Sequence, residues 1–226
     1  MTRYIKNIPY YTREERNKFI IDELGDYIGS SVLNVGGGGR KHLKSFLTEN
    51  QEYIELDIAG KPDYIVNLEK EMPLQFDDNS FETVICTDVL EHVDNLHELF
   101  SELERVSSKH IILSLPNGVA DSFDIIRNKD SVNKENNTGK HSKFYGLPFQ
   151  KPVDRHKWIF SYTEAEEFLD YKSKEYNLDI LETFGIAYYG VSLKGKLVRF
   201  VIEKILGKQM RKHLFCSTIW CVYKKR

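Results

Sequence analysis

The chain has 226 residues, of which 41% are hydrophobic and 29% are charged, and its formal net charge is −2. A chain of this length buries enough surface for one core without disulfides or a structural metal, and its composition is that of an ordinary soluble protein. The three cysteines lie in apolar runs and include no CxxC pair, which argues against a disulfide framework and favours the cytoplasm. We therefore expect a single cytoplasmic domain over residues 1–226.

Charge is separated along the chain. Residues 190–226 hold ten Lys or Arg residues against one acid, Glu203, which gives +9. Because the total is −2, residues 1–189 carry −11. A cationic end of this kind often meets an anionic partner such as phosphate, a lipid headgroup or nucleic acid.

The first elements in chain order alternate between helix and strand. Thr12 and Glu15 form a capping-box pattern that predicts a helix over about residues 13–28. Residues 31–35 (SVLNV) indicate a buried strand that runs into four glycines, Gly36 to Gly39, and a second helix is expected from there to about Glu49. Further strands are expected at residues 53–58, 63–66, 83–87 and 110–115, with helices or turns between them.

The second half of the chain is less regular. Residues 127–144 are rich in Asn, Lys and Ser, which is typical of an insertion or lid, and we expect residues 127–160 to supply this lid and an acceptor loop. A helix at 163–176, a strand at 178–184, a basic amphipathic helical segment within 190–212 and a strand at 215–223 complete the chain. Strands that alternate with helices predict a doubly wound, mostly parallel α/β sheet, here of about seven strands.

The glycine turn and a later acid indicate the kind of ligand. Glycines between a strand and the next segment let backbone N–H groups approach a ligand closely. Lys41 stands where the dinucleotide fingerprint G-x-G-x-x-G needs its third glycine, which weakens a nicotinamide or flavin interpretation. Asp57 ends the second expected strand, where a carboxylate can accept both ribose hydroxyls. Together they favour a ligand with an adenosine moiety and no pyrophosphate, although ligand-free glycine turns and surface acids are also common.

Five motifs fall in one order and spacing over roughly residues 31–117. They are Val32-Leu-Asn-Val-Gly-Gly-Gly-Gly39, Leu56-Asp-Ile58, Met72 to Ile85, Asp88-Val-Leu-Glu-His-Val93 and Leu115-Pro-Asn117. In this the sequence resembles the class I S-adenosylmethionine-dependent methyltransferases, particularly the small family with the Leu-Glu-His signature. The resemblance implies a Rossmann-like fold with an antiparallel last strand, and S-adenosyl-L-methionine as the cofactor.

The resemblance also implies cofactor contacts at the ends of the first four strands. It places Gly36, Gly37, Gly38, Thr87 and Asp88 at the methionine part, Asp57 with the adjacent Ile58 at the ribose, and Asn67 and Leu68 near the adenine. One position departs from the family pattern, because Asn34 stands where an Asp or Glu helps to orient the amino group of the cofactor. Asparagine keeps a hydrogen-bond acceptor but loses the charge, which affects the affinity expected for the cofactor and not its identity.

Glu91, His92 and His97 lie close together in the sequence and resemble a metal cluster only loosely. A structural role accounts for them, because a carboxylate favours the start of the helix that follows and the imidazole can pack under the cofactor loop. His97 fits the surface of that helix. We therefore expect no metal and a metal-independent reaction.

Residues 154–160 (DRHKWIF) gather an acid, a guanidinium, an imidazole and two aromatic side chains in one loop. They resemble the DRHxW stretch of methyltransferases in glycan and surface-polysaccharide pathways. Transfer to a hydroxyl benefits from a general base, so His156 is the expected base, Asp154 its orienting partner or a sugar ligand, and Arg155 a contact to an anionic group. Further substrate candidates are Trp158 and, in the insertion, His141. The alternative is a structural loop whose aromatic residues fill the core and whose histidine is only hydrogen-bonded.

These features predict an S-adenosylmethionine-dependent methyltransferase that acts on a hydroxyl of a sugar, a glycan or a small molecule. The alternatives are a lipid, quinone, amine or nucleobase acceptor, or a non-catalytic module that binds the cofactor. No aromatic stacking platform accompanies the basic residues, so the sequence favours a small-molecule or glycan partner over nucleic acid. It does not indicate an oligomeric state.

The basic segment within 190–212 suggests where the acceptor resides. A helix with apolar and basic faces can lie on an anionic membrane surface, and it can equally be a packed helix whose lysines reach solvent. No apolar run approaches the roughly 20 residues that cross a bilayer, and the first residues are too polar for a signal peptide. We therefore expect at most a peripheral membrane contact.

Overall fold

The computed structural model describes residues 3–6, 10, 12–127, 154–187 and 193–226. The expected lid therefore lies mostly outside the described residues, as do His141 and the first residues of the basic segment 190–212. None of the helices in the described ranges is long and apolar enough to cross a membrane.

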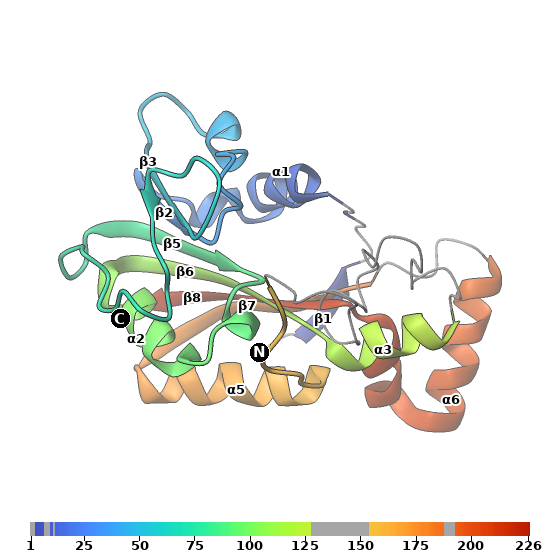
Figure 1. Ribbon diagram of the computed structural model, residues 1–226. Helices are drawn as coiled ribbons and strands as arrows, with labels where there is room; N and C mark the ends of the chain where they lie inside the picture. Colours follow the sequence, from blue (N-terminus) through green and yellow to red (C-terminus); the bar gives the residue numbers. More distant parts are fainter. Residues whose placement is uncertain (1–2, 7–9, 11, 128–153, 188–192) are drawn as a thin grey trace.

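One mixed sheet forms the centre of the protein (Figure 1). The described residues contribute eight strands to it, in the spatial order β1-β7-β8-β6-β5-β2-β3-β4. The last strand, β8, runs antiparallel to both of its neighbours, and all the other pairs are parallel, which confirms the predicted Rossmann-like class. The strands are β1 (Arg3–Lys6), β2 (Ser31–Val35), β3 (Glu52–Asp57), β4 (Tyr64–Ile65), β5 (Phe81–Thr87), β6 (Ser107–Pro116), β7 (Leu178–Ile186) and β8 (Thr218–Lys225).

Helices cover both faces of this sheet. In Figure 1, α1 lies on one face and α2 and α5 on the other, while α3 and α6 lie together beyond one end of the sheet. The helices are α1 (Arg13–Leu24), α2 (Leu96–Val106), α3 (Gly118–Arg127), α5 (Tyr162–Glu175) and α6 (Leu193–Phe215), with short 3-10 turns η1 (Gly25–Tyr27), η2 (Leu43–Phe46) and η3 (Leu90–His92). The predicted capping box at Thr12 and Glu15 is confirmed at the start of α1.

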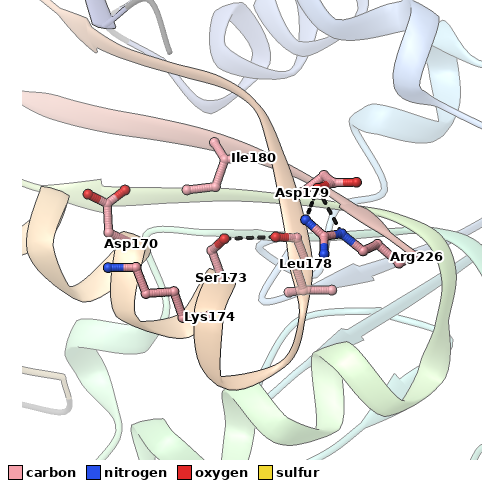
Figure 2. Close-up of a pocket in the computed structure, with 7 residues that line it drawn as sticks. All are labelled: Asp170, Ser173, Lys174, Leu178, Asp179, Ile180 and Arg226. Carbon is pink, nitrogen blue, oxygen red and sulfur yellow. Dashed lines mark hydrogen bonds and ion pairs between the residues drawn. The ribbon is translucent and has the colours of Figure 1, made fainter.

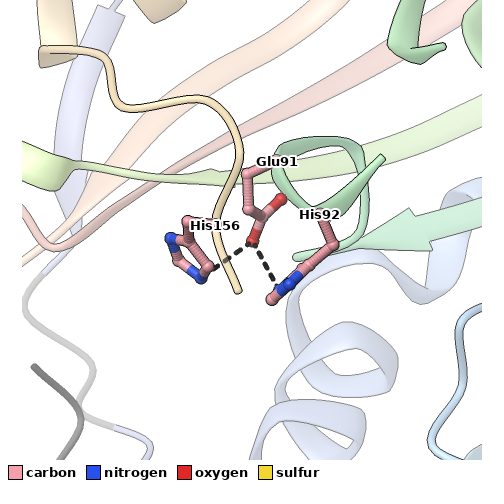
Figure 3. A group of neighbouring side chains, drawn as sticks. All are labelled: Glu91, His92 and His156. Atoms are coloured by element: carbon pink, nitrogen blue, oxygen red, sulfur yellow. Dashed lines mark ion pairs between the residues drawn. The ribbon is translucent and has the colours of Figure 1, made fainter. Parts of the chain in front are cut away.

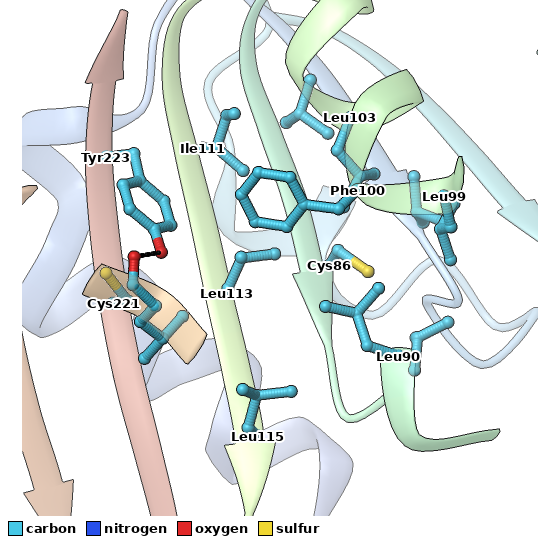
Figure 4. Close-up of a cluster of buried hydrophobic side chains, with 14 of the residues drawn as sticks. Cys86, Leu90, Leu99, Phe100, Leu103, Ile111, Leu113, Leu115, Cys221 and Tyr223 are labelled. Carbon is cyan, nitrogen blue, oxygen red and sulfur yellow. Dashed lines mark hydrogen bonds between the residues drawn. The ribbon is translucent and has the colours of Figure 1, made fainter. Parts of the chain in front are cut away.

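The cores on the two faces follow from the strand pattern, because neighbouring residues of a strand point to opposite sides. On the α2 and α5 side, Phe100 of α2 packs against Tyr223 of β8 with ring centroids 5.9 Å apart (Figure 4). On the α1 side, the ring centroids of Phe19 and Trp220 are 5.2 Å apart, and Trp220 also belongs to β8. The antiparallel strand β8 is therefore buried on both faces and holds the two cores together.

The predicted elements and the structure differ most clearly in three places. The helix expected after the glycines is wrong: the chain there forms only the 3-10 turn η2, because Gly36, Gly38, Gly39 and Lys41 have positive φ angles that an α-helix does not allow. The sheet has an eighth strand, β1, which the short segment RYIK does not signal by itself. The last helix, α6, continues to Phe215 beyond a break at Gly207.

Strand order determines where a ligand can lie. The chain runs outward from β2 to β3 and β4, and then returns to the other side of β2 to form β5 and β6. Open α/β sheets bind ligands outside the carboxyl ends of their strands where this order reverses. Here the reversal lies between β2 and β5, and the residues after both strands are those predicted to hold the cofactor.

Asn117, at the end of the Leu-Pro-Asn motif, joins two helices to the sheet. Its Nδ2 donates to the carbonyl oxygens of His213 (2.9 Å) and Cys216 (2.7 Å) at the end of α6. Its Oδ1 accepts from the amides of Val119 (3.2 Å) and Ala120 (3.3 Å), as an N-cap of α3 does. The side chain is buried, so each of these backbone groups depends on it and not on water.

We expect Asn117→Ala to lower the free energy of unfolding by about 2–4 kcal/mol, because a cap and several buried hydrogen bonds are lost together. Denaturant unfolding followed by circular dichroism measures this change. Ser122→Ala, on the same helix, serves as the control and should stay within about 0.5 kcal/mol of the wild type. A stability loss for Asn117→Ala no larger than that of the control would refute the joining role.

Candidate functional site

The glycine turn after β2 is held against β3. The amide of Gly36 donates to the carbonyl oxygen of Leu56 at 2.8 Å, and the amide of Gly38 donates to Oδ2 of Asp57 at 2.7 Å. A Cβ on Gly37 would lie 2.5 Å from Oε2 of Glu55 and 2.6 Å from Nδ2 of Asn34. The backbone therefore lies directly on polar side chains, and only glycine fits at this position.

Asp57 stands where the sequence predicts the ribose ligand, at the carboxyl end of β3. Its two oxygens already accept backbone N–H groups, Oδ2 from Gly38 and Oδ1 from Ala59 at 3.1 Å. An ionised carboxylate has about four acceptor positions, so two hydroxyl groups can still bind. The backbone contacts fix the orientation of the carboxylate, and the neighbouring Ile58 is 64% exposed beside it.

A buried carboxylate lies under the same turn, and the sequence reasoning missed it. Asn34 of β2 pairs in register with Glu55 of β3, and both side chains are buried. Nδ2 of Asn34 donates to the hydroxyl of Tyr53 at 2.9 Å, which donates to Oε2 of Glu55 at 2.6 Å. Burial, and then the bond to Glu55, raise the pKa of Tyr53. An acidic group therefore lies buried beside Asn34, on the neighbouring strand.

Asp88 follows β5 in a left-handed conformation with φ of 53°. Oδ1 of its carboxylate accepts from Oγ of Ser114 at 2.7 Å, and Oδ2 pairs with Nη1 of Arg16 at 2.5 Å. Arg16 belongs to α1 and is nearly buried. The predicted methionine end of the site is therefore bounded by an ion pair between α1 and β5, and Thr87 is buried next to it.

Asn67 and Leu68 follow β4 at the same edge of the sheet. The amide of Asn67 donates to Oε1 of Glu71 at 2.8 Å, and Oδ1 of Asn67 accepts from the amide of Glu69 at 3.0 Å. The carbonyl oxygen of Leu68 accepts from Nδ2 of Asn95 at 2.9 Å. Their turn is thus ordered by its own contacts. The predicted cofactor residues lie in, or directly after, the carboxyl-terminal ends of the four parallel strands β2 to β5.

The segment from Asp154 to Phe160 is fastened to the turn after β5. The amides of Lys157 and Trp158 donate to the carbonyl oxygen of Glu91 at 2.8 and 3.3 Å. Nε1 of Trp158 donates to the carbonyl oxygen of Val93 at 2.7 Å, although the side chain stays 41% exposed. Nζ of Lys157 pairs with Asp94 at 2.7 Å. Arg155 and the residues after it are therefore held at the carboxyl edge of the sheet.

Two histidines and one glutamate meet where these segments join (Figure 3). Oε1 of Glu91 lies 3.7 Å from Nε2 of His92 and 4.0 Å from Nε2 of His156. Oδ1 of Asp154 lies 2.6 Å from Nδ1 of His92, so Asp154 contacts the second histidine of this group. Burial, and then the charge of Asp88, hold the pKa of Glu91 well above its usual range.

One expectation about this region is corrected by the structure, and one agrees with it. The Glu-His pair does not open a helix, because Leu90–His92 form a 3-10 turn and α2 begins only at Leu96. His97 packs on Phe168 of α5 with ring centroids 6.0 Å apart, and it is not part of the three-residue group. The exposed position of His97 agrees with its expected place on the surface of that helix.

A depression of about 570 Å³ lies at the opposite edge of the sheet, where β7 begins (Figure 2). Several of its polar groups form hydrogen bonds with one another. Oγ of Ser173 donates to the carbonyl oxygen of Leu178 at 2.7 Å, and Nε of Arg226 donates to Oδ1 of Asp179 at 2.9 Å. Because none of the predicted site residues lines it, we place the functional site at the carboxyl edge.

Comparison with known families finds one match over this region. Residues 33–113 match a family model described as a methyltransferase domain. This match covers more than a third of the chain and includes the glycine turn, Asp57 and the turn after β5. A search of curated proteins gives no match.

Solved structures with the same architecture include methyltransferases of several kinds, and also the [4+2]-cyclase SpnF. The small RNA methyltransferase HEN1 aligns with 98% of this chain at 16% identity and a TM-score of 0.58, and the alignment spans only 27% of that longer chain. A SAM-dependent methyltransferase from Archaeoglobus fulgidus aligns over 95% of both chains at 17% identity and a TM-score of 0.51. The Burkholderia thailandensis 1,6-didemethyltoxoflavin-N1-methyltransferase with bound S-adenosylhomocysteine aligns over 94% of this chain and 77% of its own, at 9% identity and a TM-score of 0.50.

These likenesses establish the fold, and the domain match together with the fold supports an S-adenosylmethionine-dependent methyltransferase with S-adenosylmethionine as the cofactor. The residues present fit this group. The glycine turn leaves no room for side chains, and Asp57 presents an oriented carboxylate beside it. Which residues contact the cofactor remains a prediction.

We expect Gly37→Ala to weaken binding of S-adenosylhomocysteine by about tenfold, or about 1.4 kcal/mol. The added Cβ would displace the turn from Glu55 and Asn34, and a well-packed site does not absorb an added methyl group without strain. Isothermal titration calorimetry measures the affinity. Gly25→Ala is the matched control, because nothing lies within 4 Å of its Cβ and its backbone is helical. Equal affinities for both variants would contradict the proposed role of the turn.

Proposed function

We propose that this protein transfers the methyl group of S-adenosylmethionine to a hydroxyl group of a sugar, a glycan or a small molecule. The single observation that carries the proposal is the junction at the carboxyl edge, where the turn after β5 meets the Asp154–Phe160 segment through the backbone bonds to Glu91. This junction brings the imidazole of His156 and the carboxylates of Glu91 and Asp154 together, in a turn that closely follows the predicted cofactor residues Thr87 and Asp88.

Bound S-adenosylmethionine supplies an electrophilic methyl carbon, so the protein needs mainly to align the nucleophile and exclude water. Asp57 would accept the ribose hydroxyls, and Glu55 would supply negative charge under the glycine turn in place of Asn34. Thr87 and the Asp88–Arg16 ion pair would bound the methionine end. On the other side, Trp158 and Arg155 would receive the acceptor.

His156 and Asp154 are the residues that we place at the acceptor hydroxyl. A hydroxyl has a high pKa, so its oxygen becomes a better nucleophile when its proton is removed or its pKa is lowered. An imidazole can serve either by accepting the proton or by holding a cation that acts on the oxygen. The His156 side chain is only 4% exposed, which excludes water from its ring and preserves either interaction.

The acceptor class rests on the likeness of residues 154–158 to the DRHxW stretch. One of the compared structures is described as a small RNA methyltransferase, so RNA belongs among the acceptors tested. Lipids, quinones and amines are further acceptor classes, and a module that binds the cofactor without catalysis would methylate none of them. Transfer of labelled methyl groups to a panel of glycans, lipids and RNA separates these classes, and label found only in RNA would overturn the glycan assignment.

α6 supports a contact with an anionic membrane surface as part of this proposal. Several of its large apolar side chains are exposed, among them Leu193, Leu197, Val201 and Ile205. Basic residues such as Lys204 and Lys208 lie among them. A lipid-linked glycan would present both an acyl surface and phosphate, which are the two chemistries that such a helix fits.

We expect Asp57→Ala to raise the dissociation constant of S-adenosylhomocysteine at least tenfold, because both ribose hydroxyls lose their acceptor and the Gly38 amide loses its partner. Calorimetry measures the change, with circular dichroism to show that the variant is folded. Asp22→Ala, which removes an exposed carboxylate of α1, should bind as the wild type does. An unchanged constant for a folded Asp57→Ala protein would remove Asp57 from the site.

A further inference from the structure

We propose that Glu91, His92 and His156 bind a divalent first-row transition-metal ion, and that Asp154 positions His92 for it. The inference deepens the proposed function and rests on it in one respect, the role of the ion at the acceptor hydroxyl. It departs from the sequence expectation of a metal-independent reaction.

The geometry of the three side chains fits one ion. Metal–nitrogen and metal–oxygen bonds are about 2.0–2.2 Å long, so two donors on the same ion can be at most about 4.2 Å apart. Oε1 of Glu91 lies 3.7 Å from Nε2 of His92 and 4.0 Å from Nε2 of His156. All three donors lie within 4.8 Å of one another. A movement of a few tenths of an ångström brings them around a common centre.

The chemistry of the donors selects the class of ion. Two imidazole nitrogens and one carboxylate are the set found in catalytic zinc sites and in the facial triad of non-haem iron. Imidazole suits zinc, copper, iron and nickel, whereas calcium and magnesium take oxygen ligands. Three protein ligands also leave further coordination positions for water or a substrate oxygen, which is typical of catalytic and not of structural sites.

Glu91 gives independent evidence that something binds here. Its side chain is fully buried, and neither carboxylate oxygen has a hydrogen-bond partner in the part of the chain that the structure describes. A buried polar group without a partner costs several kcal/mol, so such groups are paired or coordinate metals. The two nearest nitrogens belong to histidines that carry a charge only when protonated. A cation between the three groups would supply the missing interaction.

The surrounding contacts orient the ligands before any ion binds. Nδ1 of His92 lies 2.6 Å from Oδ1 of Asp154 and 3.2 Å from the carbonyl oxygen of Arg155, which leaves Nε2 directed toward Glu91, as Figure 3 shows. Metal-binding histidines commonly donate their other ring N–H to a carboxylate or carbonyl in this way. The backbone bonds from Lys157 and Trp158 to Glu91 hold His156 on the same centre.

An ion at this centre would act on the acceptor. It would bind the hydroxyl oxygen as a Lewis acid and lower its pKa, so that the proton passes to water. The oxygen then forms a bond with the methyl carbon, while the carbon–sulfur bond breaks and its electron pair stays on sulfur, which yields S-adenosylhomocysteine. In this arrangement His156 is a metal ligand, and no general base is needed from its ring.

The test is metal binding by the full chain after treatment with a chelator and dialysis. Titration with Zn²⁺ alone, and with Co²⁺ followed by visible absorption, should show one equivalent bound to the wild type. Glu91→Gln and His156→Ala should each weaken binding at least 100-fold. Asp154→Asn, at a half-exposed side chain, should weaken it about 10- to 100-fold and change the Co²⁺ spectrum.

His97→Ala is the matched control, because its ring packs on Phe168 outside the group, and it should bind as the wild type does. Affinity for S-adenosylhomocysteine shows that each variant is folded. A folded wild type that binds neither ion, or an equal loss in His97→Ala, would overturn the metal site.

Activity assays separate this inference from the proposed function. Methyl transfer that is lost with the chelator and restored by a divalent ion supports both. Transfer that continues unchanged in protein shown to be metal-free overturns the role of the ion at the acceptor hydroxyl and leaves the methyltransferase intact. Stoichiometric ion binding without transfer to any acceptor in the panel leaves the site intact and counts against the proposed function.

Discussion

The arrangement of the carboxyl edge depends on the close approach of the glycine turn after β2 to the turn after β3. Gly39 and Gly60 face each other with positive φ angles, and the amide of Lys61 donates to the carbonyl oxygen of Gly39 at 2.8 Å. A Cβ on either glycine would collide with the backbone of the opposite turn. This contact holds the glycine turn close to the end of β3, where the carboxylate of Asp57 accepts from the amide of Gly38.

Two buried glutamates lie under that edge and differ in how they are satisfied. Glu55 accepts from Tyr53 at 2.6 Å and from the amide of Lys41 at 3.3 Å. Glu91 has no hydrogen-bond donor at either oxygen among the described residues and faces two imidazole rings. Burial costs a charged group heavily unless it is paired. Glu55 therefore has a structural role in the turn, whereas Glu91 lacks the partner that a bound cation would provide.

The sequence predicted features that depend on neighbours in the chain and missed those that depend on register or long-range contact. The capping box at Thr12, the strand at 31–35 and the location of Asp57 at a strand end are local patterns, and the structure confirms them. The Asn34–Glu55 pairing requires the β2–β3 register. The Arg16–Asp88 ion pair joins residues 72 positions apart, and no spacing rule reaches so far.

The structure also changes what the positive charge of residues 190–226 implies. Lys212 pairs with Glu166 at 2.9 Å and Lys225 with Glu104 at 2.8 Å, while Arg226 pairs with Asp179 at 2.6 Å. Some basic residues of the segment 190–226 thus form ion pairs with acids of residues 1–189. The positive and negative charges are separated along the sequence, but these pairs bring them together in the folded protein. The part that we propose for an anionic partner is α6, where basic residues occur among exposed apolar side chains. A membrane contact would therefore depend on this one helix, and the net charge of the segment is no measure of it.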